Sequence, residues 1–180
     1  CPGVSVIYYG DEIGMENGQL TDADIQDNFS PANSTIDSRD LERTPMQWDD
    51  TRFAGFSEVK PWLPVNKNHS FINVSTEKKI RYSTLNLHRN LLQLRQDFPI
   101  LRDGSLKIMH DTGNGFIIGL KRELNSERAY IFINFADAPQ SFFIPENAEI
   151  IASTHPRYLI LRKNQQLAVP GYCGVLLLVA

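Results

Sequence analysis

The segment Ser38 to Asp50, with the sequence SRDLERTPMQWDD, has the highest density of side chains that could do chemistry. Two arginines and several carboxylates beside a tryptophan can form a rigid polar wall against an apolar floor. Proteins hold the hydroxyl groups and ring faces of sugars in this way. The candidate substrate-binding residues are Arg39, Asp40 and Arg43. Arg39 with Asp40, or Arg43 with Glu42, could equally form solvent-exposed ion pairs that contribute little.

A second candidate is the carboxylate pair Asp11 and Glu12, which follows the apolar run Val4 to Tyr9. If that run is a strand of a parallel barrel, the pair lies just past its C-terminal end, where barrels build their active sites. The two carboxylates could instead cap the loop or pair with a nearby arginine. The sequence leaves both interpretations open.

Other catalytic or metal-binding patterns are missing from the sequence. It contains no G-x-S-x-G, H-E-x-x-H, P-loop or G-x-G-x-x-G fingerprint. The two cysteines, Cys1 and Cys173, form neither a disulfide framework nor a metal-ligand spacing, so we expect both to be buried as apolar groups. The histidines lack ligand spacing and are interpreted as surface or capping residues: His69, His88, His110 and His155. No cofactor or metal is therefore expected within this chain.

Four N-x-[S/T] acceptors for N-glycosylation occur in the first 75 residues, where turn-forming composition implies exposed loops. Their asparagines are Asn28, Asn33, Asn68 and Asn73. The first is weakened by Pro31. The crowding of four acceptors favours a secreted protein or one on the extracellular face of the plasma membrane.

Composition and charge exclude several classes of protein. The 180 residues are 42% apolar and 22% charged, which is ordinary for a folded globular protein and excludes a disordered one. The net charge of −3 provides no positive field to hold phosphates, so no nucleic-acid partner is expected. The longest apolar run, Val175 to Ala180, is too short to span a bilayer. Because the chain opens on Cys1 without an initiator Met or a signal-peptide pattern, we interpret it as a C-terminal fragment.

The first half of the chain predicts one strand, one long loop and one helix. The β-rich run Val4 to Tyr9 predicts a strand buried on both faces, as in parallel sheets. From Gly14 to Pro64 no period of 3.6 or 2 is sustained, and Trp48 and Trp62 indicate that this long loop is packed rather than disordered. Apolar residues then recur at helical spacing between Ser83 and Phe98, and Pro99 ends that helix.

The second half of the chain predicts an antiparallel sheet module, because the hydrophobic period falls to two. The predicted strands lie near 106–110, 116–121, 129–135, 140–144, 158–162 and 175–179. Turns are predicted at 112–115 and 125–127. The fold class is therefore α/β: the last β/α unit of a (β/α)8 TIM barrel, followed by an all-β antiparallel C-terminal sandwich domain.

Four segments, in this order and spacing, resemble the C-terminal third of α-glucosidases of the α-amylase superfamily, glycoside hydrolase family 13. They are GVSVIYYGDEIGM, SRDLERTPMQWDD, AGFSEVKPWLPVN and LNLHRNLLQLR. The sequence is most similar to insect maltases and microbial oligo-1,6-glucosidases, strongly from Pro2 to about Arg95 and weakly in the sheet module.

The resemblance implies a domain organisation. Residues 4–9 would be the eighth barrel strand, 10 to about 80 the loop over the active-site mouth, and 83–98 the eighth helix. The C-terminal end of the catalytic barrel would thus occupy 1–103, and the family's β-sandwich C domain 104–180.

The resemblance also implies that the catalytic residues lie outside this chain. The family uses an aspartate nucleophile, a glutamate acid/base and a second aspartate in an N-H-D motif, all on preceding strands and loops. Asn68-His69-Ser70 lacks the Asp and is not that motif. Any structural calcium would likewise be held upstream. The expected partners are therefore the upstream barrel of the same polypeptide and a small oligosaccharide substrate.

The predicted function is that of a retaining α-glucosidase acting on maltose, sucrose or short oligosaccharides. Arg43, the arginine of RTPMQW, would lie at the subsite that holds the cleaved glucose; Arg39 and Asp40 are further candidates. The alternative is a non-catalytic relative, such as the heavy chain of an amino-acid transporter. Such chains tend to lose the arginine before PMQW, whereas Arg39, Asp40 and Arg43 are all present here. A free-standing carbohydrate-binding sandwich would leave the Val4 to Tyr9 strand without a sheet.

Overall fold

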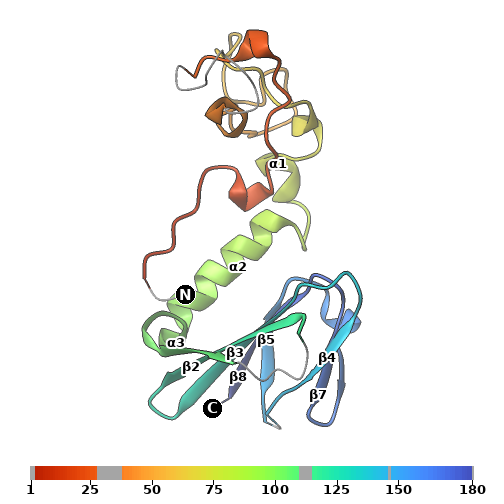
Figure 1. The fold of residues 1–180 in the computed structure, drawn as a ribbon. Coiled ribbons are helices and arrows are strands. Elements are labelled where there is room, and N and C mark those ends of the chain that lie inside the picture. The colour runs from red at the N-terminus through yellow and green to blue at the C-terminus, as the bar shows by residue number, and fades with distance from the viewer. Residues whose placement is uncertain (1–2, 28–37, 110–114, 146, 180) are drawn as a thin grey trace. The chain divides into compact units, whose positions relative to one another are not determined.

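The computed structural model describes residues 3–27, 38–109, 115–145 and 147–179. The chain divides into two compact units (Figure 1). The loop unit comprises Ser5–His88, and the sheet unit comprises Cys1–Val4 with Arg89–Ala180.

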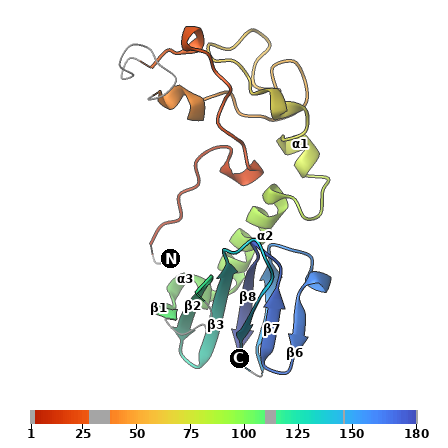
Figure 2. The same ribbon diagram turned by 45° about the vertical axis from the view of Figure 1, so that its right-hand side comes forward.

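The sheet unit contains two antiparallel sheets, visible as two layers of arrows in Figures 1 and 2. The larger has the strand order β1-β2-β3-β8-β5 and the smaller β4-β7-β6. In chain order the strands are β1 Ser105–Met109, β2 Ile117–Leu124, β3 Glu127–Asn134, β4 Gln140–Phe143, β5 Glu149–Ser153, β6 Leu161–Lys163, β7 Gln166–Val169 and β8 Gly174–Val179.

The two sheets enclose one hydrophobic core, because alternate residues of each strand face inward. On β3, Tyr130 and Phe132 point into this core, and the Phe132 ring stacks on Phe142 of β4 with centroids 4.3 Å apart. Ala129 and Ile131, which alternate with these two residues along β3, belong to a second cluster on the other face of the sheet. The period of two seen in the sequence therefore has a direct physical cause.

Two helices precede the strands, and Pro99 separates them. Helix α2 spans Thr84–Asp97 and α3 spans Pro99–Asp103. The predicted end of the first helix at Pro99 is confirmed. Phe98 is extended (φ −111°, ψ 98°), since a residue before proline is biased away from the helical region. Proline itself is favoured in the first turn of a helix, so Pro99 also begins α3, which the sequence pattern did not predict.

Arg122 on β2 fastens α3 to the larger sheet. Arg122 is only 3% exposed. Its guanidinium donates to the carbonyl oxygens of Leu101 (2.6 Å), Gly104 (2.6 Å) and Arg102 (3.1 Å). Burial lowers the pKa of Arg122. The last turn of a helix leaves carbonyls without intrahelical partners; Arg122 binds them, and Arg95 also donates to the carbonyl of Leu101 (2.7 Å).

The sequence located most strands but missed two. The predicted segments near 106–110, 116–121, 129–135, 140–144 and 175–179 match β1, β2, β3, β4 and β8. The β2–β3 turn falls at Asn125, whose φ of 53° is a conformation that asparagine tolerates. Near 158–162 a 3-10 turn at Arg157–Leu159 (η6) precedes the short β6. The pattern missed β5, where the pairing with β8 shifts register between Ile150 and Ala152 and interrupts the alternation, and it also missed β7.

The loop unit is built from short turns rather than long elements. They are η1 Asp11–Ile13, η2 Asp22–Asp24, η4 Arg39–Glu42, η5 Lys67–Ser70 and α1 Val74–Glu77. A small apolar cluster of Ile13, Met46, Val74 and Leu85 forms its interior. The predicted turn-rich character of this region is confirmed.

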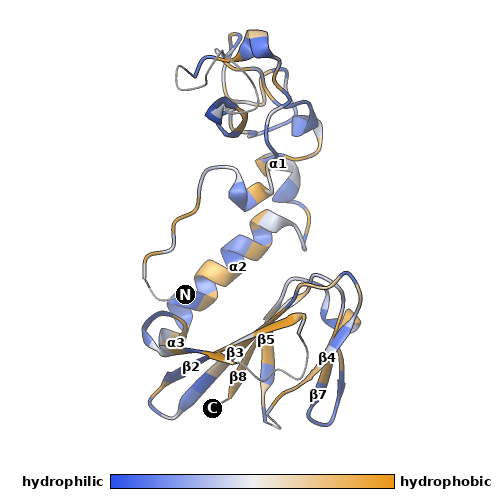
Figure 3. Cartoon of the chain, viewed as in Figure 1, coloured by the Kyte–Doolittle hydropathy of each residue, from blue (hydrophilic) through white to orange (hydrophobic). Residues whose placement is uncertain are grey.

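The predicted buried strand over Val4–Tyr9 is not formed in this structure. Residues 4–8 belong to no strand, and Val6 is 87% exposed although the segment is coloured as hydrophobic in Figure 3. A parallel strand needs neighbours on both sides to bind its backbone groups. Within the described residues every strand pairs inside the two antiparallel sheets, so nothing here pairs with this segment.

Replacing Arg122 with Met should destabilise the sheet unit by about 2 to 4 kcal/mol, because the carbonyls of Arg102 and Gly104 lose a charged donor and that of Leu101 keeps only Arg95, while the apolar stem is kept. Urea unfolding of the variant measures this. The control is Arg128→Met at an exposed position of β3, which should change stability by less than about 0.5 kcal/mol. Equal unfolding midpoints for the two variants would refute the fastening role of Arg122.

Candidate functional site

Side-chain hydrogen bonds shape the loop unit where regular structure is lacking. The Asn66 side chain donates to the carbonyls of Glu16 (3.3 Å) and Asn17 (3.2 Å), about 50 residues earlier in the chain. The amide of Val74 donates to the carbonyl of Gln47 (3.0 Å), and that of Ser75 to the carbonyl of Trp48 (2.9 Å). These contacts hold the PMQW run against α1.

Two buried carboxylates, Asp27 and Asp40, organise the start of the SRDLERTPMQWDD segment. Asp40 is fully buried, and its Oδ2 accepts the backbone amides of Gln26 (2.6 Å) and Asp27 (2.7 Å). Asp27 accepts Nε and Nη2 of Arg39, both at 2.9 Å, in a two-pronged pair. We call these two carboxylates with Arg39 and Arg43 the Arg–Asp cluster.

Arg43 completes the Arg–Asp cluster from its other side. Its Nη1 atom lies 3.8 Å from Asp40 Oδ1 and 3.9 Å from Asp27 Oδ2, and its side chain is 37% exposed. Asp40 Oδ1 has no hydrogen-bond partner among the described residues, so the nearby guanidinium balances its charge. Buried charges persist only when they are paired in this way. The guanidinium of Arg43 therefore lies at ion-pair distance from both carboxylates, too far for a hydrogen bond to either.

A hollow of about 310 Å³ opens beside Arg43. Its apolar side is formed by six residues: Tyr9, Pro45, Met46, Trp48, Phe56 and Trp62. Glu12, Arg43 and Thr44 provide the polar groups. We call this the aromatic hollow. An apolar lining with a few fixed polar groups is the usual form of a small-molecule site.

The candidate substrate-binding residues divide into two roles. Arg43 lines the aromatic hollow. Arg39 and Asp40 do not line it, and both are engaged in the Arg–Asp cluster instead. The alternative pairings of Arg39 with Asp40 and of Arg43 with Glu42 are not the contacts that form. The sequence could not reveal Asp27 as the partner, because it lies 12 residues before Arg39.

The carboxylates of Asp11 and Glu12 mainly stabilise the turn in which they lie. Asp11 Oδ2 accepts the amide of Tyr8 (3.1 Å) and Glu12 Oε2 accepts the amide of Gly10 (2.8 Å), so both carboxylates cap the turn that follows Tyr9. Glu12 also lines the aromatic hollow. Of the two interpretations left open by the sequence, capping therefore accounts for both residues.

Tyr9 is a site residue that sequence analysis missed, since it was assigned to a strand. Its hydroxyl donates to the carbonyl of Thr44 (3.1 Å) and lines the hollow. Burial, together with the neighbouring Tyr8, raises the pKa of Tyr9 to about 12. The raised pKa extends to more alkaline pH the range in which the hydroxyl is protonated and acts as a donor.

The long loop is packed around buried side chains, as Trp48 and Trp62 indicated, although neither tryptophan is itself buried. Trp48 is 50% exposed and Trp62 is 65% exposed. The interior of the loop unit is filled instead by smaller side chains, with Leu63 and Ala54 fully buried. The tryptophans border the aromatic hollow, where half of each side chain stays accessible.

Two of the predicted glycosylation sites have structural roles. Asn73 is fully buried and caps α1, accepting the amide of Thr76 (2.7 Å) and donating to the carbonyl of His69 (2.7 Å). Asn68 is 9% exposed and donates to Glu16 Oε2 (3.0 Å). Asn28 and Asn33 lie outside the described residues.

The residues considered for metal or redox chemistry occupy separate positions. Cys173 is buried as expected, and burial raises the pKa of its thiol; Cys1 and His110 lie outside the described residues. Nδ1 of His69 lies 2.9 Å from the carbonyl oxygen of Asn66 in its own turn. Within the described residues, no three histidine, cysteine or acidic side chains gather in an arrangement that could bind a metal ion. In the same part of the chain, no helix is long and apolar enough to cross a membrane.

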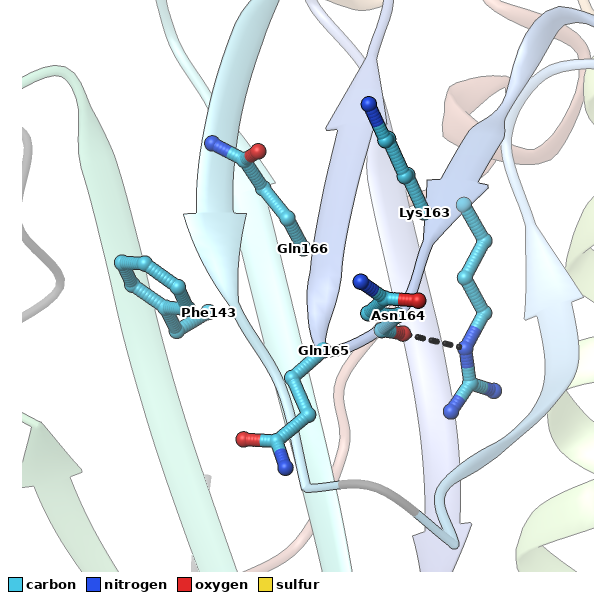
Figure 4. A pocket seen from close by; sticks show the side chains of 6 residues that line it. Phe143, Lys163, Asn164, Gln165 and Gln166 are labelled. Atoms are coloured by element: carbon cyan, nitrogen blue, oxygen red, sulfur yellow. Dashed lines mark hydrogen bonds between the residues drawn. The ribbon is translucent and has the colours of Figure 1, made fainter.

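A larger hollow of about 720 Å³ lies on the smaller sheet (Figure 4). It is lined by Phe143 and by the β6–β7 turn from Arg162 to Gln166. Figure 4 shows Lys163, Gln165 and Gln166 pointing in different directions rather than toward a common point. The Nε atom of Arg162 donates to the carbonyl of Asn164 (3.2 Å). Because its polar groups do not converge, this hollow is a weaker candidate than the aromatic hollow.

Comparison with known proteins shows the family of this chain. Residues 1–104 match the family described as Alpha amylase, catalytic domain. An α-glucosidase of Apis mellifera is 36% identical over 144 residues, covering 77% of this chain and 25% of that protein. Maltase 1 of Drosophila virilis is 38% identical over 136 residues, covering 70% of this chain and 20% of that protein. The trehalulose synthase of Pseudomonas mesoacidophila MX-45 has a solved structure that superimposes with a TM-score of 0.85 at 29% identity, covering 99% of this chain and 36% of that one.

The chain belongs to the α-amylase family, since more than half of it matches the family's catalytic domain. The predicted resemblance is confirmed. The fold class is confirmed as well, because solved structures of the family cover nearly the whole chain, from the end of the barrel through the antiparallel domain. The chain spans about a quarter of the length of these curated relatives.

Replacing Asp40 with Asn should destabilise the loop unit by about 2 to 4 kcal/mol, because it removes a buried charge that faces Arg43 and accepts two backbone amides. Thermal or urea unfolding measures the loss. Glu42→Gln, at an exposed carboxylate two residues away, is the matched control and should change stability by less than about 0.5 kcal/mol. A neutral result for Asp40→Asn would show that the Arg–Asp cluster does not hold the segment together.

Proposed function

We propose that the protein containing this chain is a retaining α-glucosidase that releases α-linked glucose from maltose, sucrose or short oligosaccharides. The main support for this proposal is the position of Arg43. Its guanidinium lies 3.8 to 3.9 Å from two buried carboxylates, and the same side chain lines a hollow with aromatic walls. Relatives described as α-glucosidase, maltase and oligo-1,6-glucosidase support the same class of substrate.

The proposed reaction is a double displacement at the anomeric carbon of glucose. One carboxylate attacks and forms a covalent glucosyl-enzyme, and a second carboxyl group about 5 to 5.5 Å away protonates the leaving group and then activates water. The resemblance implies that both groups, and the stabilising aspartate of the N-H-D motif, lie outside these 180 residues. Within this chain the proposed contribution is binding: Arg43 donates fixed hydrogen bonds to sugar hydroxyls.

The fixed position of Arg43 matters for rate. The charges of Asp27 and Asp40 attract the guanidinium toward the wall of the hollow, which favours the side-chain positions from which it can reach a sugar. Donors that are pre-oriented stabilise charge as the ring moves toward an oxocarbenium-like state. The non-catalytic alternative, a transporter heavy chain, gives no reason to keep this arginine aimed into a hollow.

Arg43→Ala in the complete protein should lower kcat/KM for maltose by about 30- to 1,000-fold, equivalent to roughly 2 to 4 kcal/mol of transition-state binding. The control is Arg52→Ala, which removes another exposed arginine of the loop unit outside the hollow and should leave kcat/KM within about twofold. Thermal unfolding of the same preparations separates a binding role from a structural one. A wild-type kcat/KM with a lowered melting temperature would assign Arg43 to structure alone. Complete protein that turns over no α-glucoside would favour the non-catalytic relative.

We further propose that the protein is secreted or displayed on the extracellular face of the plasma membrane. The support is the cluster of glycosylation acceptors at the start of the chain. Because the amides of Asn68 and Asn73 are occupied by hydrogen bonds, Asn33 is the preferred site, with Asn28 weakened by the following proline.

Protein made through a secretory pathway should therefore lose mass on treatment with an N-glycosidase. Thr35→Ala, which destroys the Asn33 acceptor, should abolish most of this mass change. Ser75→Ala destroys the Asn73 acceptor without altering the capping asparagine, and should leave the change intact. Mass spectrometry before and after the treatment measures the mass change of the wild-type protein and of both variants. Wild-type protein of unchanged mass would count against secretion.

A further inference from the structure

The backbone of Arg43 is held by hydrogen bonds, whereas its side chain is held by charge alone. The guanidinium lies 3.8 Å from Asp40 Oδ1 and 3.9 Å from Asp27 Oδ2, which is too far for a hydrogen bond to either. The backbone amide of Arg43, in contrast, donates to the carbonyl of Asp40 (3.0 Å) at the end of the turn η4. The direction in which the side chain leaves this turn therefore depends on how the backbone around Arg43 is fixed.

The hydroxyl of Tyr9 lies against the backbone on both sides of Arg43. It donates to the carbonyl of Thr44 (3.1 Å), and the carbonyl of Glu42 lies 3.4 Å away as a second, weaker acceptor. These two carbonyls belong to the residues directly before and after Arg43. Because 35 positions separate Tyr9 from Thr44, the contact joins two distant parts of the loop unit.

The turn that follows Tyr9 is fixed by hydrogen bonds of its own. The carbonyl of Gly10 accepts the amides of Ile13 (3.1 Å) and Met15 (2.9 Å), and Ile13 is buried. Gly10 has a φ of 93°, and a Cβ there would lie 2.9 Å from the Cβ of Met15, so a glycine is needed for this tight turn. The Tyr9 hydroxyl thus reaches residues 42–44 from an anchored part of the chain.

A second set of contacts holds the same stretch beside Arg43. Thr44 is fully buried, and its Cγ2 methyl lies so close to Gly18 that a Cβ at Gly18 would be 2.3 Å from it. The amide of Gly18 also donates to the carbonyl of Leu41 (2.7 Å). Together with the contact from Tyr9, these interactions hold the backbone on both sides of Arg43.

The side chain of Arg43 and the hydroxyl of Tyr9 are also close to each other. Both residues line the aromatic hollow. Burial raises the pKa of Tyr9 to about 12, and the positive charge of Arg43 opposes this rise, which indicates that the guanidinium is near the phenol oxygen. Loss of the hydroxyl would therefore affect Arg43 through both its backbone and its side chain.

We propose that Tyr9 is a positioning residue that sets, through the backbone of residues 42–44, where the guanidinium of Arg43 enters the aromatic hollow. The inference rests on the proposed α-glucosidase function only for its consequence in catalysis. Tyr9 acts on the substrate through Arg43 and takes no part in bond breaking. Removing its hydroxyl should consequently impair only the contribution that Arg43 makes.

Kinetics of Tyr9→Phe in the complete protein test the proposal, since this substitution removes the hydroxyl and keeps the ring. Its kcat/KM for maltose should fall about 3- to 10-fold, the effect of one lost hydrogen bond between neutral groups. In a protein that already carries Arg43→Ala, the same substitution should change kcat/KM by less than about 1.5-fold, because the residue through which Tyr9 acts is gone. The matched control is Tyr82→Phe, at an exposed tyrosine of the loop unit that does not line the hollow, and its kcat/KM should stay within about twofold.

Hydrogen exchange of the complete protein tests the positioning role without any turnover. In Tyr9→Phe the peptide that contains residues 41–48 should exchange its amide hydrogens faster than in the wild-type protein, because this stretch loses a contact that holds it. Peptides of the sheet unit should exchange as in the wild-type protein, and Tyr82→Phe should leave the 41–48 peptide unchanged. Faster exchange of that peptide in a protein that turns over no α-glucoside would support the positioning role and reject the proposed activity.

Four results would overturn the positioning role of Tyr9. One is a 41–48 peptide that exchanges at the wild-type rate in Tyr9→Phe. Another is faster exchange throughout both units, which would assign the hydroxyl to overall stability. The third is a loss of kcat/KM that is equally large with and without Arg43→Ala, which would show that Tyr9 contacts the substrate independently of Arg43. The last is a wild-type kcat/KM for Tyr9→Phe in an enzyme that Arg43→Ala impairs.

Discussion

Two carboxylates without access to water, Asp27 and Asp40, dominate the energetics of the loop unit. A buried carboxylate is tolerated only when cations and hydrogen-bond donors surround it. Asp40 accepts hydrogen bonds from the backbone amides of Gln26 and Asp27, and Asp27 accepts hydrogen bonds from the side chain of Arg39. Both carboxylates lie within 4 Å of the Arg43 guanidinium, and Arg43 also lines the aromatic hollow. The need to balance these buried charges thus helps to position Arg43, the side chain that we propose for substrate binding.

The two units satisfy their backbone groups in different ways. In the sheet unit, ladders between strands bind most of them, and Arg122 binds the carbonyls left at the end of α3. The loop unit has no ladder among its described residues, so side chains such as Asn66, Asn73 and Asp40 do the same work. A loop held by specific side chains can keep a precise surface shape, which suits a site.

Family membership and local geometry carry different parts of the functional argument. The match to the α-amylase family fixes the fold class, while the chain's modest share of its relatives leaves the reaction to be proposed. The aromatic hollow connects the two, because its mixture of rings and fixed polar groups suits a carbohydrate. The same Arg–Asp cluster explains why Arg39 and Asp40, chemically suited to a sugar, instead hold Arg43 in place.

Sequence alone determined the elements whose signals are local. The helical spacing of leucines before Pro99 located α2, alternation located β1 to β4 and β8, and the RTPMQW run indicated the family and Arg43. Local signals suffice there because hydrophobic periodicity directly reflects which face of an element is buried. In β5 a register shift between Ile150 and Ala152 interrupts the alternation, so the pattern did not reveal that strand.

Only the tertiary structure decided the contacts between residues far apart in the chain. Pairing of Asp27 with Arg39, exposure of Trp48 and Trp62, and the capping role of Asn73 depend on how the loop folds on itself. The run Val4 to Tyr9 has the composition of a buried strand, yet composition supplies no hydrogen-bonding neighbours, and the described residues provide none. A side chain's type fixes what it can bind, but its partners are set by desolvation and packing, which arise only when the chain is folded.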